Sequence, residues 1–131
     1  MQKNSPSYDE ITQVVKAFYQ KATQHPQLGH FFSAIDDFAD HEKRIIDFWY
    51  LSMGGKLEQP PKIDMIGKHF SLGIKDDDLQ TWLALFSETL GEQLPDAKAR
   101  FWMDKVMTIA ARMKQIIIDH QSMGVQIKPD S

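Results

Sequence analysis

The chain has 131 residues, of which 42% are hydrophobic and 25% are charged, a composition typical of a globular protein of one domain. Because it contains no cysteine, disulfides, thiolate metal sites, iron–sulfur clusters and cysteine nucleophiles are excluded. The net charge of -3 provides no basic surface for nucleic acid or an anionic membrane, so neither is expected as a partner.

The first predicted element is a helix at about 8–24. Ser7, followed three residues later by Glu10, has the capping-box spacing that opens a helix. Apolar residues at helical spacing form one stripe, with Tyr19 beside it: Ile11, Val14, Val15, Phe18 and Ala22. Pro26 and Gly29 then interrupt the helical pattern. Three apolar residues predict a short, buried turn in this region: Leu28, Phe31 and Phe32.

A second helix is predicted to begin near Asp36 or Asp37, which are good N-cap residues, and to end at Gly54–Gly55. Its apolar stripe is expected to consist of Phe38, Ile45, Phe48, Trp49 and Ser52. His41 lies within this stripe, one turn before Ile45. The second helix therefore carries a histidine on its apolar face.

A short third helix is predicted after the loop at 56–61, because Pro61 suits the first position of a helix. Gly73 would end it. Its apolar face is expected to contain a second histidine among hydrophobic residues: Met65, Ile66, His69 and Phe70.

Two longer helices are predicted in the last part of the chain. Asp76 caps the first of them, which ends at Gly91 and is expected to bury Leu79, Trp82, Leu83, Phe86 and Leu90. The other runs from Pro95 to about His120, with a stripe of Trp102, Val106, Ile109, Ala110, Met113, Ile116 and Ile117. No segment has the pattern of a strand, so the expected fold class is all-α.

His41 and His69 are the residues best suited to carry chemistry. An iron porphyrin in a helical pocket needs one imidazole on the metal and apolar walls around the ring. A bound diatomic gas is stabilised by a polar donor, which Tyr19, His41 or Trp82 could supply. The alternative remains open, because a histidine or aromatic residue on an apolar face is commonly a core residue with a satisfied polar atom.

Other polar groups have simpler explanations. Helix capping accounts for Asp36, Asp37 and Asp40 better than a cation site, and the Asp76–Asp78 run is a solvated first turn. His25 and His30 lie in a turn, where a surface role is expected. The chain has no nucleophile elbow, phosphate-binding loop, dinucleotide fingerprint or H-E-x-x-H motif.

Four blocks, in order over residues 18–90, resemble the truncated haemoglobins of group III. The first block is Phe18-Tyr19, followed by Pro26-Gln27-Leu28-Gly29 and Phe31-Phe32. The second is the distal-helix pattern H-x-x-x-I-x-x-F-W, formed by His41, Ile45, Phe48 and Trp49. The third is the proximal H-x-x-L of His69 to Leu72, and the fourth is Trp82-Leu83-Ala84-Leu85-Phe86 with Thr89-Leu90. The loop at 54–65 departs from the pattern of that group.

The resemblance implies a truncated globin fold, with two helices over two helices around haem b. It implies that His69 is the proximal iron ligand and that Tyr19, His41 and Trp82 surround the bound gas. The expected apolar lining of the haem pocket comprises Phe31, Phe32, Ile45, Phe48 and Trp49.

The function expected from this resemblance is reversible binding of oxygen, nitric oxide or another diatomic ligand. Nitric oxide dioxygenase or peroxidase-like activity is also open, and would need a reductase because the chain has no flavin or nicotinamide motif. A haem-free helical interaction module is the alternative, and a non-haem metal site at His41 and His69 is a weaker one, because no carboxylates share their faces. We expect one globin domain over 1–131, flexible ends at 1–7 and 121–131, and a cytoplasmic location.

Overall fold

The computed structural model describes residues 4–60 and 73–115, and the third predicted helix, with His69, lies outside these ranges. The described residues form four α-helices and one short 3-10 helix, with no strand among them, so the all-α prediction is confirmed. None of these helices is long and apolar enough to span a membrane.

Helix α1 spans Tyr8–Ala22 and begins as predicted. The Ser7 hydroxyl accepts a hydrogen bond from the Glu10 amide at 3.1 Å, and the Ser7 amide donates to Glu10 Oε1 at 2.9 Å. This reciprocal pair satisfies two amides at the helix start. The predicted stripe is buried, and α1 ends two residues earlier than expected.

The turn after α1 contains the 3-10 helix Gly29–Phe32. Leu28 is buried, with 2% of its surface exposed, whereas Phe31 and Phe32 are only partly buried. The prediction of a buried turn is therefore right for Leu28 and wrong for the two phenylalanines. Both phenylalanines therefore remain partly exposed in the described structure.

Helix α2 spans Phe38–Ser52 and begins at the Asp37 cap, whose carboxylate accepts from the Asp40 amide at 3.0 Å. Gly54 follows with a φ of 97°, a backbone conformation that favours glycine. The buried residues of α2 differ from the predicted stripe: they are Ile46, Asp47 and Trp49. The other members of that stripe are only partly buried, namely Phe38, His41, Ile45, Phe48 and Ser52.

Helix α4 spans Asp76–Gln93, and its boundaries correct the prediction at both ends. Lys75 occupies the N-cap position, and its amide donates to Asp78 Oδ2 at 3.0 Å, so Asp76 lies inside the helix. The helix also continues through Gly91. It ends at Gln93, and the C-cap residue Leu94 has the extended backbone that is favoured for a residue before proline.

Helix α5 spans Asp96–Met113, with Pro95 at the N-cap position. Its predicted stripe is buried at Trp102, Val106 and Ala110 and partly buried at Ile109 and Met113. The remainder of this predicted helix, including the last two members of its stripe, lies outside the described residues.

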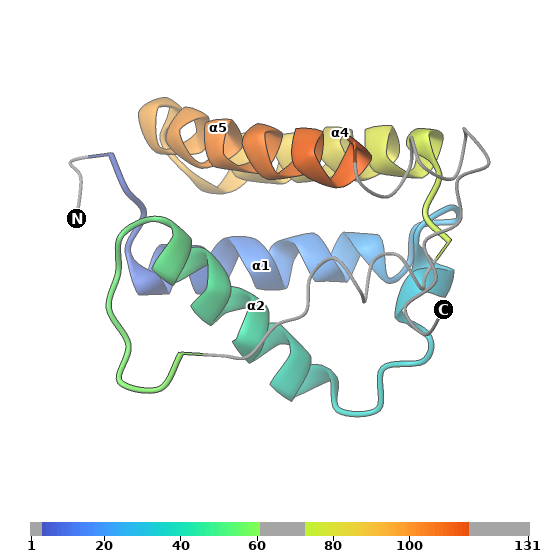
Figure 1. Ribbon diagram of the computed structural model, residues 1–131, viewed down its shortest axis with the longest axis horizontal. Helices are drawn as coiled ribbons and strands as arrows, with labels where there is room; N and C mark the ends of the chain where they lie inside the picture. Colours follow the sequence, from blue (N-terminus) through green and yellow to red (C-terminus); the bar gives the residue numbers. More distant parts are fainter. Residues whose placement is uncertain (1–3, 61–72, 116–131) are drawn as a thin grey trace.

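The four helices form two layers (Figure 1). Helices α4 and α5 lie side by side in one layer, while α1 and α2 cross each other in the second. Helix α1 contacts both α2 and α4, so it joins the layers. This arrangement is the two-over-two packing expected of a truncated globin.

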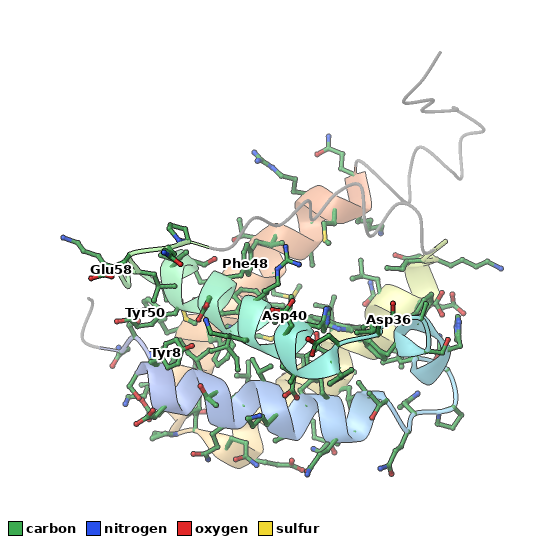
Figure 2. The ribbon with its side chains drawn as sticks, turned by 90° about the horizontal axis from the view of Figure 1, so that it is seen from below. Tyr8, Asp36, Asp40, Phe48, Tyr50 and Glu58 are labelled. Atoms are coloured by element: carbon green, nitrogen blue, oxygen red, sulfur yellow. The ribbon has the colours of Figure 1, made fainter. Side chains whose placement is uncertain are left out.

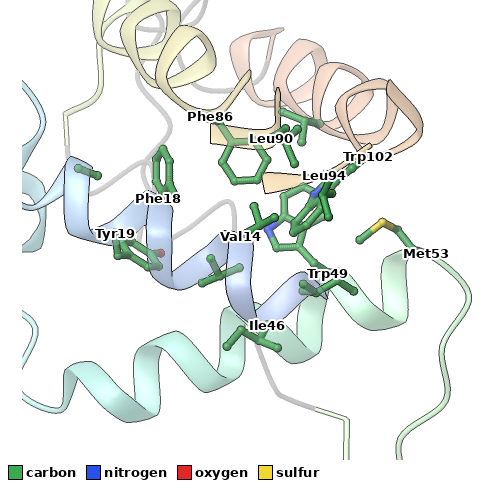
Figure 3. Close-up of a cluster of buried hydrophobic side chains, with 14 of the residues drawn as sticks. Val14, Phe18, Tyr19, Ile46, Trp49, Met53, Phe86, Leu90, Leu94 and Trp102 are labelled. Carbon is green, nitrogen blue, oxygen red and sulfur yellow. The ribbon is translucent and has the colours of Figure 1, made fainter. Parts of the chain in front are cut away.

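The core between the layers is rich in aromatic rings (Figure 3). Trp102 is completely buried, and its ring lies 5.8 Å from Trp49 and 5.4 Å from Phe86. Trp102 Nε1 is buried without a hydrogen-bond partner among the described residues. Burial of these large rings supplies much of the apolar area that stabilises the fold.

Residues just before α1 pack against the rest of the described structure. Ser5 and Pro6 are buried, and the Ser5 hydroxyl donates to the Met53 carbonyl oxygen at 3.1 Å. Ser7 is the cap of α1. Ser5 thus links the chain before α1 to the residue that follows α2, and the flexibility of the two chain ends stays a prediction.

Candidate functional site

A tyrosine–histidine pair joins α1 to α2. The hydroxyl oxygen of Tyr19 lies 3.0 Å from Nε2 of His41. Tyr19 is 9% exposed and His41 is partly buried, so this hydrogen bond is shielded from water. The structure therefore brings together two of the three residues predicted to surround a bound gas.

Aromatic rings enclose this pair. The Tyr19 ring has edge contacts with Phe32, at a centroid distance of 5.4 Å, and with Phe38, at 5.2 Å. The ring of Phe38 also lies 5.8 Å from that of His41. Edge contacts of this kind fix ring orientation and add about 0.5–1.5 kcal/mol each beyond area burial. The hydroxyl and the imidazole are thus held in one geometry by apolar neighbours.

Trp82 is connected to the Tyr19–His41 pair by Phe18, whose ring contacts both Trp82 and Tyr19. The Phe18 ring lies 5.6 Å from Tyr19 and 5.3 Å from Trp82. Trp82 is stacked on Phe86 with a centroid distance of 4.9 Å and an interplanar angle of 5°. Trp82 is partly buried, and its indole N–H makes no hydrogen bond to a described residue. That N–H is available as a donor to a ligand.

The surroundings of Tyr19 keep its hydroxyl protonated. Burial is the larger cause that raises the pKa of Tyr19, and the negative charge of Glu42 raises it further. Glu42 is itself paired with Lys16, at a distance of 3.1 Å between Nζ and Oε1. A neutral tyrosine can both donate and accept a hydrogen bond, which suits it to a polar ligand or to His41.

The remaining predicted pocket residues differ in burial and in their ring contacts. Ile45 and Phe48 are partly buried and pack against the core. Trp49 is a core residue, 7% exposed, with ring contacts to Phe48, Phe86 and Trp102. Among the described residues, the ring partner of Phe31 is His30, at 4.0 Å, so no ring contact joins Phe31 to Tyr19.

Two residues at the site had no assigned role in the sequence prediction. Phe38 was recognised as apolar, but its contact with Tyr19 depends on how α1 crosses α2. Glu42 was not singled out, because a charged residue beside a histidine is usually solvated. Its side chain is only 14% exposed, so its charge acts on Tyr19 at short range.

The donor set fits a flat apolar cofactor that carries a small polar ligand. Three helices present the polar groups: α1 a hydroxyl, α2 an imidazole and α4 an indole N–H, and they are accompanied by the partly buried apolar side chains of Phe32, Ile45 and Phe48. No group of three or more potential metal ligands occurs among the described residues. The described part of the chain is therefore suited to the ligand side of such a cofactor, and His69 lies outside it.

Comparison with known proteins agrees with the fold. The family model described as bacterial-like globin matches residues 7–116. Among solved structures, the group III truncated haemoglobin from Campylobacter jejuni matches with a TM-score of 0.78 and 19% identity, covering 92% of this chain and 98% of that chain. A search of curated proteins found no significant match. The truncated globin fold is thereby confirmed.

Proposed function

The chain belongs to the bacterial-like globin family, and from this premise we propose that it binds haem b and holds oxygen or another diatomic ligand at the haem iron. The observation that supports this function best is the Tyr19–His41 hydrogen bond inside an aromatic wall. A polar pair in such surroundings favours a small ligand that accepts hydrogen bonds.

Each residue of the proposed site would have a separate role. Haem supplies an iron that binds and releases the ligand. In this proposal His69 is the proximal ligand, Tyr19 and Trp82 donate hydrogen bonds to the bound ligand, and His41 orients the Tyr19 hydroxyl. The apolar pocket lining comprises Phe31, Phe32, Ile45, Phe48 and Trp49.

The proposed ligands are oxygen, nitric oxide and similar small molecules. We propose a single globin domain acting in the cytoplasm. Sustained redox turnover, such as nitric oxide oxidation, would take electrons from a separate reductase, because the sequence has no flavin or nicotinamide motif.

An absorption spectrum tests haem binding directly. The purified protein is mixed with hemin and measured in the oxidised state, then after reduction under carbon monoxide. We expect a stoichiometric Soret band that shifts with carbon monoxide, because a histidine-ligated iron with an open site binds that gas. Absence of a stoichiometric band would contradict the proposal and would favour a haem-free helical interaction module.

Tyr19→Phe tests the ligand side of the site. A hydrogen bond to a charged or strongly polarised partner contributes about 1.5–3 kcal/mol, so we expect oxygen release to be faster by roughly tenfold to a hundredfold. Release is measured by stopped-flow absorption. Tyr50→Phe is the matched control, because Tyr50 is also a tyrosine of the α1–α2 interface but its hydroxyl has no hydrogen bond to a described residue. Equal release rates in Tyr19→Phe and the wild type would exclude Tyr19 as the main donor.

A further inference from the structure

A second tyrosine of α1 forms a hydrogen bond with α2 away from the ligand site. The hydroxyl of Tyr8 donates to Oδ1 of Asp47 at 2.6 Å, across 39 positions of sequence. The Tyr8 ring also has an edge contact with Tyr50, at 5.2 Å and 84°. Tyr8 and Tyr50 lie beside each other where the start of α1 meets α2 (Figure 2). Tyr8 therefore contacts α2 at Asp47 and Tyr50, which are about one helical turn apart.

Asp47 is a buried carboxylate, with 5% of its surface exposed. Burying a charge is costly unless hydrogen bonds and a counter-charge compensate for the lost water. Asp47 has both, since Lys43 Nζ lies 2.7 Å from its other oxygen. Lys43 belongs to the same helix and is 69% exposed, so among the described residues only Tyr8 connects this carboxylate to another helix.

The two tyrosines occupy the same side of α1. They are eleven positions apart, which is about three helical turns, or roughly 16 Å along the helix axis. Their partners on α2, His41 and Asp47, are six positions apart. Two tyrosine hydroxyls of α1 thus fix α2 at two points. The bond to Asp47 is the stronger in kind, because its acceptor is ionised.

We propose that the Tyr8–Asp47 bond is a positioning device that sets the distance between Tyr19 and His41. It fixes the rotation and the placement of α2 on α1 at one end, so that the Tyr19–His41 bond forms at the other. Asp47 lies on a different face of α2 from His41, so it acts through the helix and not on the ligand. The inference rests on the proposed function only where ligand release is measured.

A double-mutant cycle tests this coupling. Oxygen release is measured by stopped flow for the wild type, Tyr8→Phe, Tyr19→Phe and the double variant. We expect Tyr8→Phe to speed release by about twofold to fivefold, and to have no further effect once Tyr19→Phe is present, because both act through one bond. An unchanged rate in Tyr8→Phe, or effects that multiply in the double variant, would overturn the proposal.

Two control variants separate positioning from general stability. Lys98→Met removes the bond from α5 to Glu10 at the start of α1, which involves no residue of α2. It is expected to lower the melting temperature but to leave oxygen release unchanged. Asp47→Asn keeps a carbonyl acceptor for Tyr8 and is expected to release oxygen close to the wild-type rate. If Lys98→Met speeds release as much as Tyr8→Phe does, the effect is one of stability alone.

A second measurement reads His41 without depending on ligand release. Nuclear magnetic resonance of protein containing 15N-histidine is recorded, with the His41 signals assigned by their loss in His41→Gln. In Tyr8→Phe these signals are expected to move toward their positions in Tyr19→Phe. The reduced, carbon-monoxide-saturated protein is diamagnetic and suits this experiment; protein that fails to take up haem is measured as purified. Failure of haem binding and failure of the positioning bond therefore give different results. Unmoved His41 signals in Tyr8→Phe would overturn the positioning proposal.

If Tyr8→Phe does not fold, Tyr8→Phe combined with Asp47→Leu removes both partners and leaves no unpaired carboxylate in the interior. Faster oxygen release and displaced His41 signals are expected in this variant as well. Wild-type values for both would overturn the proposal.

Discussion

The two tyrosine hydroxyls that face α2 have raised pKa values for different physical reasons. For Tyr8 the main cause is the hydrogen bond to Asp47, which raises the pKa to about 12. For Tyr19 the main cause is burial, followed by the charge of Glu42. The first hydroxyl is held by a specific partner, whereas the second is surrounded by rings and bonded to an imidazole. Loss of the Tyr8 bond would leave the buried Asp47 carboxylate without that hydrogen bond, whereas loss of the Tyr19–His41 bond would not.

The raised pKa of Tyr8 predicts a loss of stability at high pH. Because the folded-state pKa is about 12 and the unfolded value is 10.0, the stabilisation is fully present below pH 10 and disappears as pH rises through 12. Urea unfolding of the wild type from pH 9 to pH 12 measures this loss of unfolding free energy.

Tyr8→Phe removes this titration, so the difference in unfolding free energy between the wild type and Tyr8→Phe should shrink by about 1–2 kcal/mol over the same pH interval. A constant difference between wild type and Tyr8→Phe would show that Tyr8 does not donate to Asp47.

Asp47 also shows where prediction from the sequence ends at the scale of single residues. An aspartate outside the apolar stripe of a helix is expected to be solvated, and the sequence pattern had no signal for its burial. Its environment is created by Tyr8, 39 positions away, and depends on how α1 crosses α2. Tyr19 and His41, in contrast, could be identified because both lie on or beside apolar stripes and match a family pattern.

At the scale of helices, local signals predicted the starts better than the ends. Ser7 with Glu10, and Asp37, are capping residues whose side chains bond to amides nearby, so sequence alone identifies them. The sequence predicts the end of α4 at Gly91, but the helix continues to Gln93, whose side chain accepts a hydrogen bond from Gln13 of α1 at 2.7 Å. Gly91 therefore weakens the helix locally without ending it.

Two glycines in helical or near-helical segments predict opposite effects of alanine. A Cβ at Gly29 would lie 2.7 Å from the Thr23 carbonyl oxygen, which is backbone and cannot move aside cheaply. A Cβ at Gly91, inside α4, would meet no atom within 4 Å. We expect Gly29→Ala to lower the unfolding free energy by about 1–3 kcal/mol, and Gly91→Ala to raise it by about 0.5–1 kcal/mol.

Urea unfolding measures both glycine variants. Each one checks the other, because the same methyl group is added in both. If Gly29→Ala were as stable as the wild type, the close approach of Gly29 to Thr23 would be disproved. If Gly91→Ala were destabilised, the space beside Gly91 would be filled in solution.

At the scale of the whole molecule, the two helix layers place the donors on different helices. Tyr19 belongs to α1, His41 to α2 and Trp82 to α4, and Phe18 links the first and the third through ring contacts. The site therefore exists only when both layers are packed. It follows that a cofactor bound between them would stabilise the entire fold, because it binds the folded chain and not the unfolded one.

His69→Ala tests this link between the cofactor and the fold. If His69 is the proximal ligand, the variant should lose most of its haem, and the wild type loaded with haem should melt higher than the variant. Ligand at a thousand times its dissociation constant contributes about 4 kcal/mol, which corresponds to roughly 15 °C for a domain of this size. Haem content is measured by absorption and melting by circular dichroism. His30→Ala is the control, since His30 is an exposed histidine whose ring contact is with Phe31. A His69→Ala protein with an unchanged haem-to-protein ratio would require another residue as the ligand.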